Sequence, residues 1–231
     1  MIKKNILILE GGYNEEHDVS LKSSKEIQKI LKKIKLKFKI IRVKPKDFEK
    51  RISKYKNYIC FNALHGPFGE DGKVQKILKK NKIRFTHSGH ISSKNCFDKV
   101  ISKKIILKNK ILTPKFTVLS KKKFTSKNIE NLKQIYKKIV IKPTKSGSSY
   151  GTKIIKNKAD LKKFLNKIEE YKKKLPSNND ILIEEFISGK ELTVSTIKFT
   201  KNIESLAVTE IKPKNNFFDY QAKYSKGYAK H

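Results

Sequence analysis

The stretch Lys142-Pro-Thr-Lys-Ser-Gly-Ser-Ser-Tyr-Gly151 carries the strongest signal for the fold of this chain. Apolar runs flank it at residues 139–141 and 154–155, so we expect a β-hairpin with this stretch as its turn. Gly147 and Gly151 permit positive φ and close backbone approach, while the lysines and serines supply positive charge and hydroxyl groups. Such a turn suits a polyanion, most naturally the phosphates of a nucleotide. The alternative is a solvated polar turn, and the residue order of a Walker P-loop is absent.

The residues before this turn alternate between strand-like and helix-like patterns. Residues 6–9 are an apolar run that leads to two glycines, and apolar residues recur at helical spacing over residues 19–34. Further strands are predicted at residues 38–43 and 58–64, and the second of these leads into another helix. This alternation indicates a parallel α/β sheet, in which ligands bind beyond the carboxyl ends of the strands.

The pattern changes near residue 90. A helix over residues 92–108 leads into a connection that contains Pro114. The elements expected after it are a strand, a helix, the hairpin, a second helix and a strand, at residues 116–119, 126–136, 139–155, 159–173 and 181–186. Residues 192–199 and 203–211 have the pattern of an antiparallel pair. The part of the chain after residue 90 is therefore predicted to combine helices with antiparallel strands, as in an α+β fold.

The formal charge of +35 arises from 56 lysines and arginines against 21 aspartates and glutamates. Such an excess invites a nucleic-acid function. Only Arg42, Arg51 and Arg84 are arginines, however, and base recognition and bidentate phosphate contacts favour arginine. The lysines are also spread along the whole chain. We therefore expect no specific nucleic-acid partner, and a basic nucleic-acid-binding protein is kept as the less favoured alternative.

The two cysteines, Cys60 and Cys96, lack the spacing of metal ligands and are interpreted as reduced thiols. No apolar stretch is long enough to span a membrane. The first residues lead directly into a strand-like run, which differs from a secretory signal. The sequence thus predicts a cytoplasmic protein without a membrane partner.

Four motifs occur in a fixed order along the chain. They are Gly11-Gly12-x-x-x-Glu16-x-x-Val19-Ser20, Leu64-His65-Gly66-x-x-Gly69-Glu70-Asp71-Gly72, Lys142-Pro143-x-x-x-Gly147-Ser148-Ser149-x-Gly151 and Phe218-Asp219-Tyr220-x-Ala222-Lys223-Tyr224. Together they resemble the D-alanine–D-alanine ligases of the ATP-grasp superfamily. The resemblance extends from about residue 5 to the last residue.

This resemblance implies an α/β fold in which a parallel-sheet, Rossmann-like (pre-ATP-grasp) domain precedes an incomplete ATP-grasp fold of the α+β type. The expected parts are residues 1–90, a central subdomain at 91–178 that carries the phosphate lid, and the start of a C-terminal subdomain at 179–231. In such ligases ATP phosphorylates the carboxylate of one D-alanine, and the amine of a second attacks the acyl phosphate. The product, D-alanyl-D-alanine, enters peptidoglycan precursors and so serves cell-wall synthesis and cell shape.

The family's ATP-binding and lid roles fall on seven residues of this sequence. Lys99 and Lys142 match the lysines that hold the ATP phosphates, and the Ser148-Ser149 turn matches the mobile phosphate lid. The remaining matches are Glu184 and Glu191, where the family contacts adenine and ribose, and Lys223, which reaches the transferred phosphate.

The substrate and catalytic roles fall on four residues. Glu16 matches the acid that binds the ammonium group of the first D-alanine, and His65 lies where the family approaches its carboxyl group. The resemblance implies a hydrogen-bonded set of Glu16, Ser148 and Tyr224 that closes the lid. Relatives that make a D-alanyl-D-lactate ester carry phenylalanine at the last position, so Tyr224 favours the dipeptide.

The sequence stops at His231, only a few residues after the last motif. Family members continue with the ligands for Mg²⁺ (or Mn²⁺), an arginine and the site of the second D-alanine, so no metal ligand is assigned here. We expect little ligase activity from this chain alone, and an uncovered face or edge on the strands at 192–199 and 203–211. The main alternative is a nucleotide-binding remnant without catalysis. A different ATP-grasp ligase is a further alternative, which the motifs of Glu16 and Tyr224 together disfavour. Family members are commonly dimers through the N-terminal half.

Overall fold

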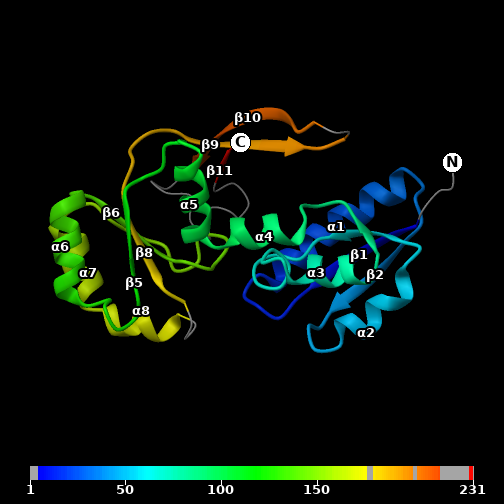
Figure 1. Cartoon of the computed structure of the whole chain (residues 1–231), viewed down its shortest axis with the longest axis horizontal. Helices are drawn as coiled ribbons and strands as arrows, with labels where there is room; N and C mark the ends of the chain where they lie inside the picture. Colours follow the sequence, from blue (N-terminus) through cyan, green and yellow to red (C-terminus); the bar gives the residue numbers. More distant parts are fainter. Residues whose placement is uncertain (1–4, 176–178, 200–201, 214–228, 231) are drawn as a thin grey trace. The chain divides into compact units, whose positions relative to one another are not determined.

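The computed structural model describes residues 5–175, 179–199, 202–213 and 229–230 (Figure 1). The chain divides into two compact units. The first comprises Met1–Leu112 together with Lys145–Gly147, and the second comprises Thr113–Thr144 and Ser148–His231. The sequence-based division into three parts, with its first boundary at residue 90, stays a prediction.

The first unit is built on a parallel sheet, as predicted. Its strands lie in the order β2-β1-β3-β4, and every neighbouring pair is parallel. The strands are β1 (Ile6–Gly11), β2 (Phe38–Val43), β3 (Ile59–Asn62) and β4 (Arg84–Phe85). The helical elements are α1 (His17–Lys33), α2 (Phe48–Ile52), the short 3₁₀ helix η1 (Ser53–Tyr55), α3 (Lys73–Lys80), α4 (His90–Phe97) and α5 (Lys99–Lys108).

Residues 6–9 of strand β1 are all apolar because both faces of its sheet are covered. Leu7 and Leu9 belong to a buried cluster that also contains residues of α2 and α3. Ile8 points to the other face and packs with Leu31 of α1 and with Ala63. Helix α1 thus covers one face, and α2 with α3 covers the other.

The single helix predicted over residues 92–108 is wrong, because the structure breaks it into α4 and α5 at Asp98. The backbone of Asp98 is extended, with φ −85° and ψ 105°. Its carboxylate accepts hydrogen bonds from the N–H groups of Val100 and Ile101 at 3.0 and 3.2 Å. Such an N-cap satisfies donors that a helix start leaves unpaired, which favours a new helix at this point.

The second unit contains an antiparallel sheet in the order β5-β8-β6-β7. Its strands are β5 (Phe116–Leu119), β6 (Ile139–Pro143), β7 (Lys153–Ile155) and β8 (Ile181–Glu185). Strands β6 and β7 pair with Ile139 opposite Ile155, so the predicted hairpin is confirmed. The helices are α6 (Ser126–Tyr136), α7 (Lys158–Leu165) and α8 (Ile168–Lys174), the last two replacing one predicted helix.

The two faces of this sheet differ in character. Ile141 of β6 and Ile183 of β8 point toward the helices, where they join Phe164 of α7 in the buried core. Side chains alternate along a strand. Lys142 and Glu184, the next residues along these two strands, therefore lie on the opposite face of the sheet.

A third sheet, β11-β10-β9, follows in the chain. Its strands are β9 (Glu191–Ile197), β10 (Glu204–Pro213) and β11 (Ala229–Lys230). Val194 of β9 pairs directly with Val208 of β10, and these side chains are 47% and 65% exposed. Leu192 on the same strand face is also exposed. The uncovered apolar face expected for these strands is therefore present among the described residues.

His87 lies between β4 and α4, and its ring packs against Phe85 with the centroids 4.9 Å apart. Burial lowers the pKa of His87 from 6.5 to about 4, because the charged imidazolium would lose its hydration. Neither ring nitrogen has a hydrogen-bond partner in the part of the chain that the structure describes. The fold therefore favours the neutral ring.

We expect the protein to lose stability as the pH falls from 6.5 to 4, because in that range only the unfolded chain binds the His87 proton. The pKa shift corresponds to about 3 kcal/mol of unfolding free energy at the acidic end. The measurement is the free energy of unfolding in urea, taken near neutral pH and near pH 4. Between these two pH values the parent chain should lose about 3 kcal/mol more than the His87→Phe variant. Equal losses in the two proteins would contradict the expectation.

Candidate active site

Glu16 lies at the N-terminus of α1, beyond the carboxyl end of β1, and is only 2% exposed. Its backbone N–H donates to the side-chain oxygen of Asn14 at 2.9 Å. The side-chain nitrogen of Asn14 in turn donates to the carbonyls of His65 and Pro67 at 2.9 and 3.2 Å. One asparagine thus connects the loops after β1 and β3, which meet at the same edge of the parallel sheet. Sequence reasoning did not single out Asn14.

The imidazole of His65 is held between two side chains. Its Nε2 hydrogen-bonds with the hydroxyl of Ser23 in α1 at 2.9 Å. Its Nδ1 lies 3.5 Å from a carboxylate oxygen of Glu70. Both ring nitrogens therefore have protein partners, and a ligand carboxylate would have to replace one of them.

Two glycines lie against the Glu16 carboxylate. A Cβ built on Gly66, which has φ +67°, would lie 2.3 Å from Oε2 of Glu16. A Cβ built on Gly147 would lie 3.0 Å from the same oxygen. Gly147 belongs to the turn that the sequence singles out, so the structure brings the tip of this turn to Glu16.

Charged groups tether the tip of the turn to the junction of α4 and α5. Lys99, the first residue of α5, donates through Nζ to the carbonyl of Ser146 at 2.7 Å. Lys145 lies 3.6 Å from the Asp98 carboxylate, the same group that caps α5. Lysines and backbone carbonyls therefore hold the tip in place in this structure.

In the second unit, Lys142 of β6 and Glu184 of β8 form an ion pair on the sheet face opposite the helices. Glu184 is 5% exposed. The sequence places the first with the phosphates of a nucleotide and the second with its base or ribose, and here the two side chains pair with each other. Glu191, the other predicted nucleoside contact, is exposed at the start of β9.

The turn itself adopts an uncommon backbone. Ser148 and Ser149 have φ of 47° and 59°, and Gly151 has φ of 67°. Positive φ at successive non-glycine residues is rare, and such conformations cluster at functional sites. Backbone N–H groups in tight turns of this kind form concave sites that suit phosphate oxygens.

Both ends of the turn are anchored by groups that sequence reasoning missed. At the first end, the hydroxyl of Thr144 donates to the side-chain oxygen of Asn179 at 2.7 Å, and both residues are buried. At the other end, the hydroxyl of Tyr171 donates to the carbonyl of Gly151 at 2.7 Å. Burial raises the pKa of Tyr171, so its phenol stays protonated and able to donate.

Two predicted site residues lie outside the described part of the chain, and the searches for a metal site and a membrane span cover only the described part. Tyr224 and Lys223 fall within residues 214–228, which the structure does not describe. Within the described residues, no three His, Cys, Asp or Glu side chains gather as a metal site. No helix in that part of the chain is both long and apolar enough to cross a membrane.

Comparisons with known proteins agree with this arrangement. A family profile described as "D-ala D-ala ligase C-terminus" matches residues 105–231. The D-alanine–D-alanine ligase of Pelagibacter ubique is 42% identical over 224 residues, which cover 96% of this chain and 69% of that protein. The ligase of Thermotoga maritima is 34% identical over 223 residues, with the same two coverages.

Solved structures agree with the sequence relatives. The D-alanine–D-alanine ligase from Bacillus anthracis superposes with a TM-score of 0.74 at 31% identity, over 98% of this chain and 70% of that one. Its complex with ATP gives a TM-score of 0.70 at 29% identity, over 93% and 68%. The predicted mixed α/β architecture is thus confirmed, and the chain spans about 69% of the length of these sequence relatives. On the combined evidence of sequence and fold, this chain belongs to the D-alanine–D-alanine ligase family.

Proposed function

We propose that this chain provides the nucleotide lid and the first-substrate site of a ligase that joins two D-alanines at the expense of ATP. The observation that carries the proposal is the position of the turn tip. Gly147 lies against the buried Glu16 carboxylate, and Lys99 holds Ser146 beside it. A donor-rich turn beside a buried acid suits a reaction in which phosphate and an amino acid must meet.

Glu16 is the proposed partner of the D-alanine ammonium group. Its carboxylate is buried. The backbone of Gly66 and of Gly147 can approach this carboxylate closely because neither residue has a side chain. A buried carboxylate binds an ammonium more strongly than an exposed one does, because water screens the pair less. His65 is proposed to approach the substrate carboxyl group, once that group replaces Ser23 or Glu70 as its partner.

ATP is proposed to bind through the turn and its neighbouring lysines. Lys142 and Lys99 supply positive charge, and the backbone N–H groups at Ser148 and Ser149 supply donors. Glu184, Glu191 and Lys223 complete the proposed ATP-binding set. A ligase from Bacillus anthracis has been solved in complex with ATP, which supports a nucleotide site in the common fold.

The proposed chemistry is positioning and charge neutralisation. The ligase reaction forms an acyl phosphate on the first D-alanine, and the amine of the second displaces that phosphate. Lysines and backbone donors stabilise the charge that develops on the transferred phosphoryl group. Ser148 and Tyr224 are proposed to join Glu16 in closing the lid, and Tyr224 to favour the dipeptide over an ester.

Mg²⁺ or Mn²⁺ would add charge neutralisation at the phosphates. The described residues do not form a set of ligands that fits such an ion. We therefore assign no step to a metal and propose that the 231-residue chain turns over little on its own. The need for ATP is consistent with the proposed cytoplasmic location. The N-terminal domain, residues 1–90, is the proposed homodimer contact.

Calorimetric titration of the chain with D-alanine tests the substrate site. We expect binding of D-alanine, and a Glu16→Gln variant should bind it roughly 10- to 100-fold more weakly, because a neutral amide replaces the carboxylate that pairs with the ammonium. L-alanine and the exposed-site variant Glu130→Gln are the matched controls. If the chain binds ATP but not D-alanine, a nucleotide-binding remnant is favoured. A separate measurement of ADP release tests turnover, and a rate near that of an intact ligase would contradict the proposed low turnover.

A further inference from the structure

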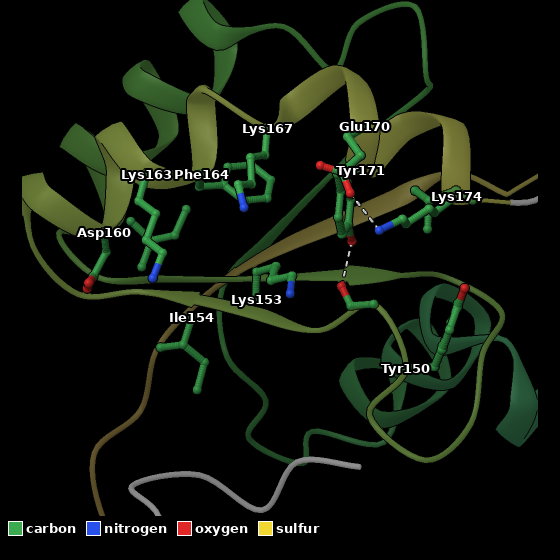
Figure 2. A pocket seen from close by; sticks show the side chains of 13 residues that line it. Tyr150, Lys153, Ile154, Asp160, Lys163, Phe164, Lys167, Glu170, Tyr171 and Lys174 are labelled. Carbon is green, nitrogen blue, oxygen red and sulfur yellow. Dashed lines mark hydrogen bonds and ion pairs between the residues drawn. The ribbon is translucent and has the colours of Figure 1, made fainter. Parts of the chain in front are cut away.

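A cavity of about 620 Å³ lies between strand β7 and helices α7 and α8 (Figure 2). Its volume is within the range of small-molecule sites, roughly 300–1,000 Å³. All of its lining residues belong to the second unit. Ile155, Phe164 and Leu175, which are core residues, form part of its wall.

Four lysines line this cavity; Lys174 pairs with Glu170, and the other three come from different places along the chain. Lys153 comes from β7, Lys163 from α7, and Lys167 from the junction of α7 and α8. Figure 2 shows the side chains of Lys163 and Lys167 extending from the helical side toward strand β7, on which Lys153 lies. The side chains of these three lysines form no ion pair or hydrogen bond with any residue that the structure describes. Like charges held near one another are unfavourable unless an anion joins them.

The acidic residues of the lining are already engaged elsewhere. The Asp160 carboxylate accepts from the backbone N–H groups of Lys156 and Asn157 at 2.9 and 3.2 Å, as part of the N-terminal cap of α7. Glu170 pairs with Lys174 at 2.7 Å. The hydrogen bond from Lys174 is the main reason that the pKa of Glu170 is low, and the charges of Lys167 and Lys153 add to it. The cavity therefore keeps an excess of positive charge.

Most of this cavity lies on the helix-covered face of the sheet, which Ile155 of β7 shares with the core. At the edge strand β7 it also reaches Ile154, which points to the other face, and Tyr150 and Gly151 at the end of the lid turn. The ion pair of Lys142 and Glu184 lies on the opposite face. The three lysines are thus not accounted for by the proposed ATP contacts.

We propose that this cavity binds a small organic phosphate. A phosphate monoester offers nearly two negative charges and three acceptor oxygens, which suits a cavity lined by several ammonium groups. The aromatic side chains of Tyr150 and Tyr171 line the same cavity and provide surface for the organic part of the ligand. Tyr171 also holds the carbonyl of Gly151, so the ligand would lie beside the end of the lid turn.

Titration with phenyl phosphate at low ionic strength tests the proposal. The parent chain should bind it, and the triple variant Lys153→Gln, Lys163→Gln, Lys167→Gln should raise the dissociation constant at least roughly tenfold, since three charge-assisted contacts are lost. The three cavity lysines are exposed, and the matched control Lys122→Gln, Lys127→Gln, Lys162→Gln removes the same charge from equally exposed positions of the same unit that do not line the cavity. This control should bind phenyl phosphate like the parent.

Three outcomes would overturn the proposal. The first is absence of phenyl phosphate binding by the parent chain. The second is equal weakening of binding in both triple variants, which would assign binding to net charge alone. The third is binding of uncharged phenol as tight as that of phenyl phosphate. A Lys142→Gln variant tells this site from the nucleotide site. It should leave phenyl phosphate binding unchanged, and loss of binding there would place the probe on the other face of the sheet. This test does not depend on ligase activity.

Discussion

Replacing Lys142 with methionine is expected to weaken ATP binding by about a hundredfold or more. The ammonium group of Lys142 pairs with Glu184 on the face of the β5-β8-β6-β7 sheet opposite the helices, beside the start of the lid turn. A lysine contact with a phosphate is worth about 1.5–3 kcal/mol, and the variant leaves the Glu184 carboxylate to repel the anion. Titration of the chain with ATP measures the change directly.

Two comparison variants separate binding from folding. Lys138→Met removes the same charge from an exposed position at the edge of β6 and should leave ATP affinity within about twofold of the parent, as expected for a screened surface charge. The double variant Lys142→Met, Glu184→Gln should recover stability relative to the single variant, because no buried carboxylate has lost its cation. Its ATP affinity should stay low. Parent-like affinity in Lys142→Met would remove this lysine from the proposed site.

The sequence predicted the elements whose signal is local. The apolar run at residues 6–9 forms the first part of β1, because a strand covered on both faces favours a continuous apolar run. The hairpin of β6 and β7 was equally readable, since its turn residues stand between two apolar runs. Both features depend on neighbours in the chain, and no tertiary information was needed for either.

The contacts that shape the site depend on register and tertiary packing. Lys142 and Glu184 pair because β6 and β8 align Lys142 with Leu182, an alignment that no local pattern reports. The hydrogen bond from Tyr171 to the carbonyl of Gly151 likewise depends on tertiary packing, because it joins a helix to a turn. The break at Asp98 had a local signal, a good N-cap residue within an otherwise helical stretch, but the helical periodicity on both sides concealed it.

Replacing Gly72 with alanine is expected to lower the free energy of unfolding by about 2–4 kcal/mol. Gly72 precedes α3 with φ of +89°, a conformation that costs a residue with a Cβ roughly 1–2 kcal/mol. The added Cβ would also lie 2.4 Å from the backbone carbonyl of His90, at the start of α4. Backbone cannot rotate away as a side chain can, so α3 and α4 would have to separate.

Gly89→Ala is the matched control for this prediction, because it adds the same methyl group one residue before α4. Gly89 has an ordinary φ of −71°, and nothing lies within 4 Å of a Cβ built there. Gly89 is the N-cap of α4, where alanine is somewhat less favourable than glycine, so the unfolding free energy of this variant should stay within about 1 kcal/mol of the parent. Urea titrations of the three proteins followed by circular dichroism measure both differences. If the two variants lose equal stability, the close approach of α4 to Gly72 is not what requires glycine at this position. A selective loss in Gly72→Ala would instead tie the Gly69-Glu70-Asp71-Gly72 motif to the packing of α3 against α4, and so to the loop that positions His65 and Gly66 beside Glu16.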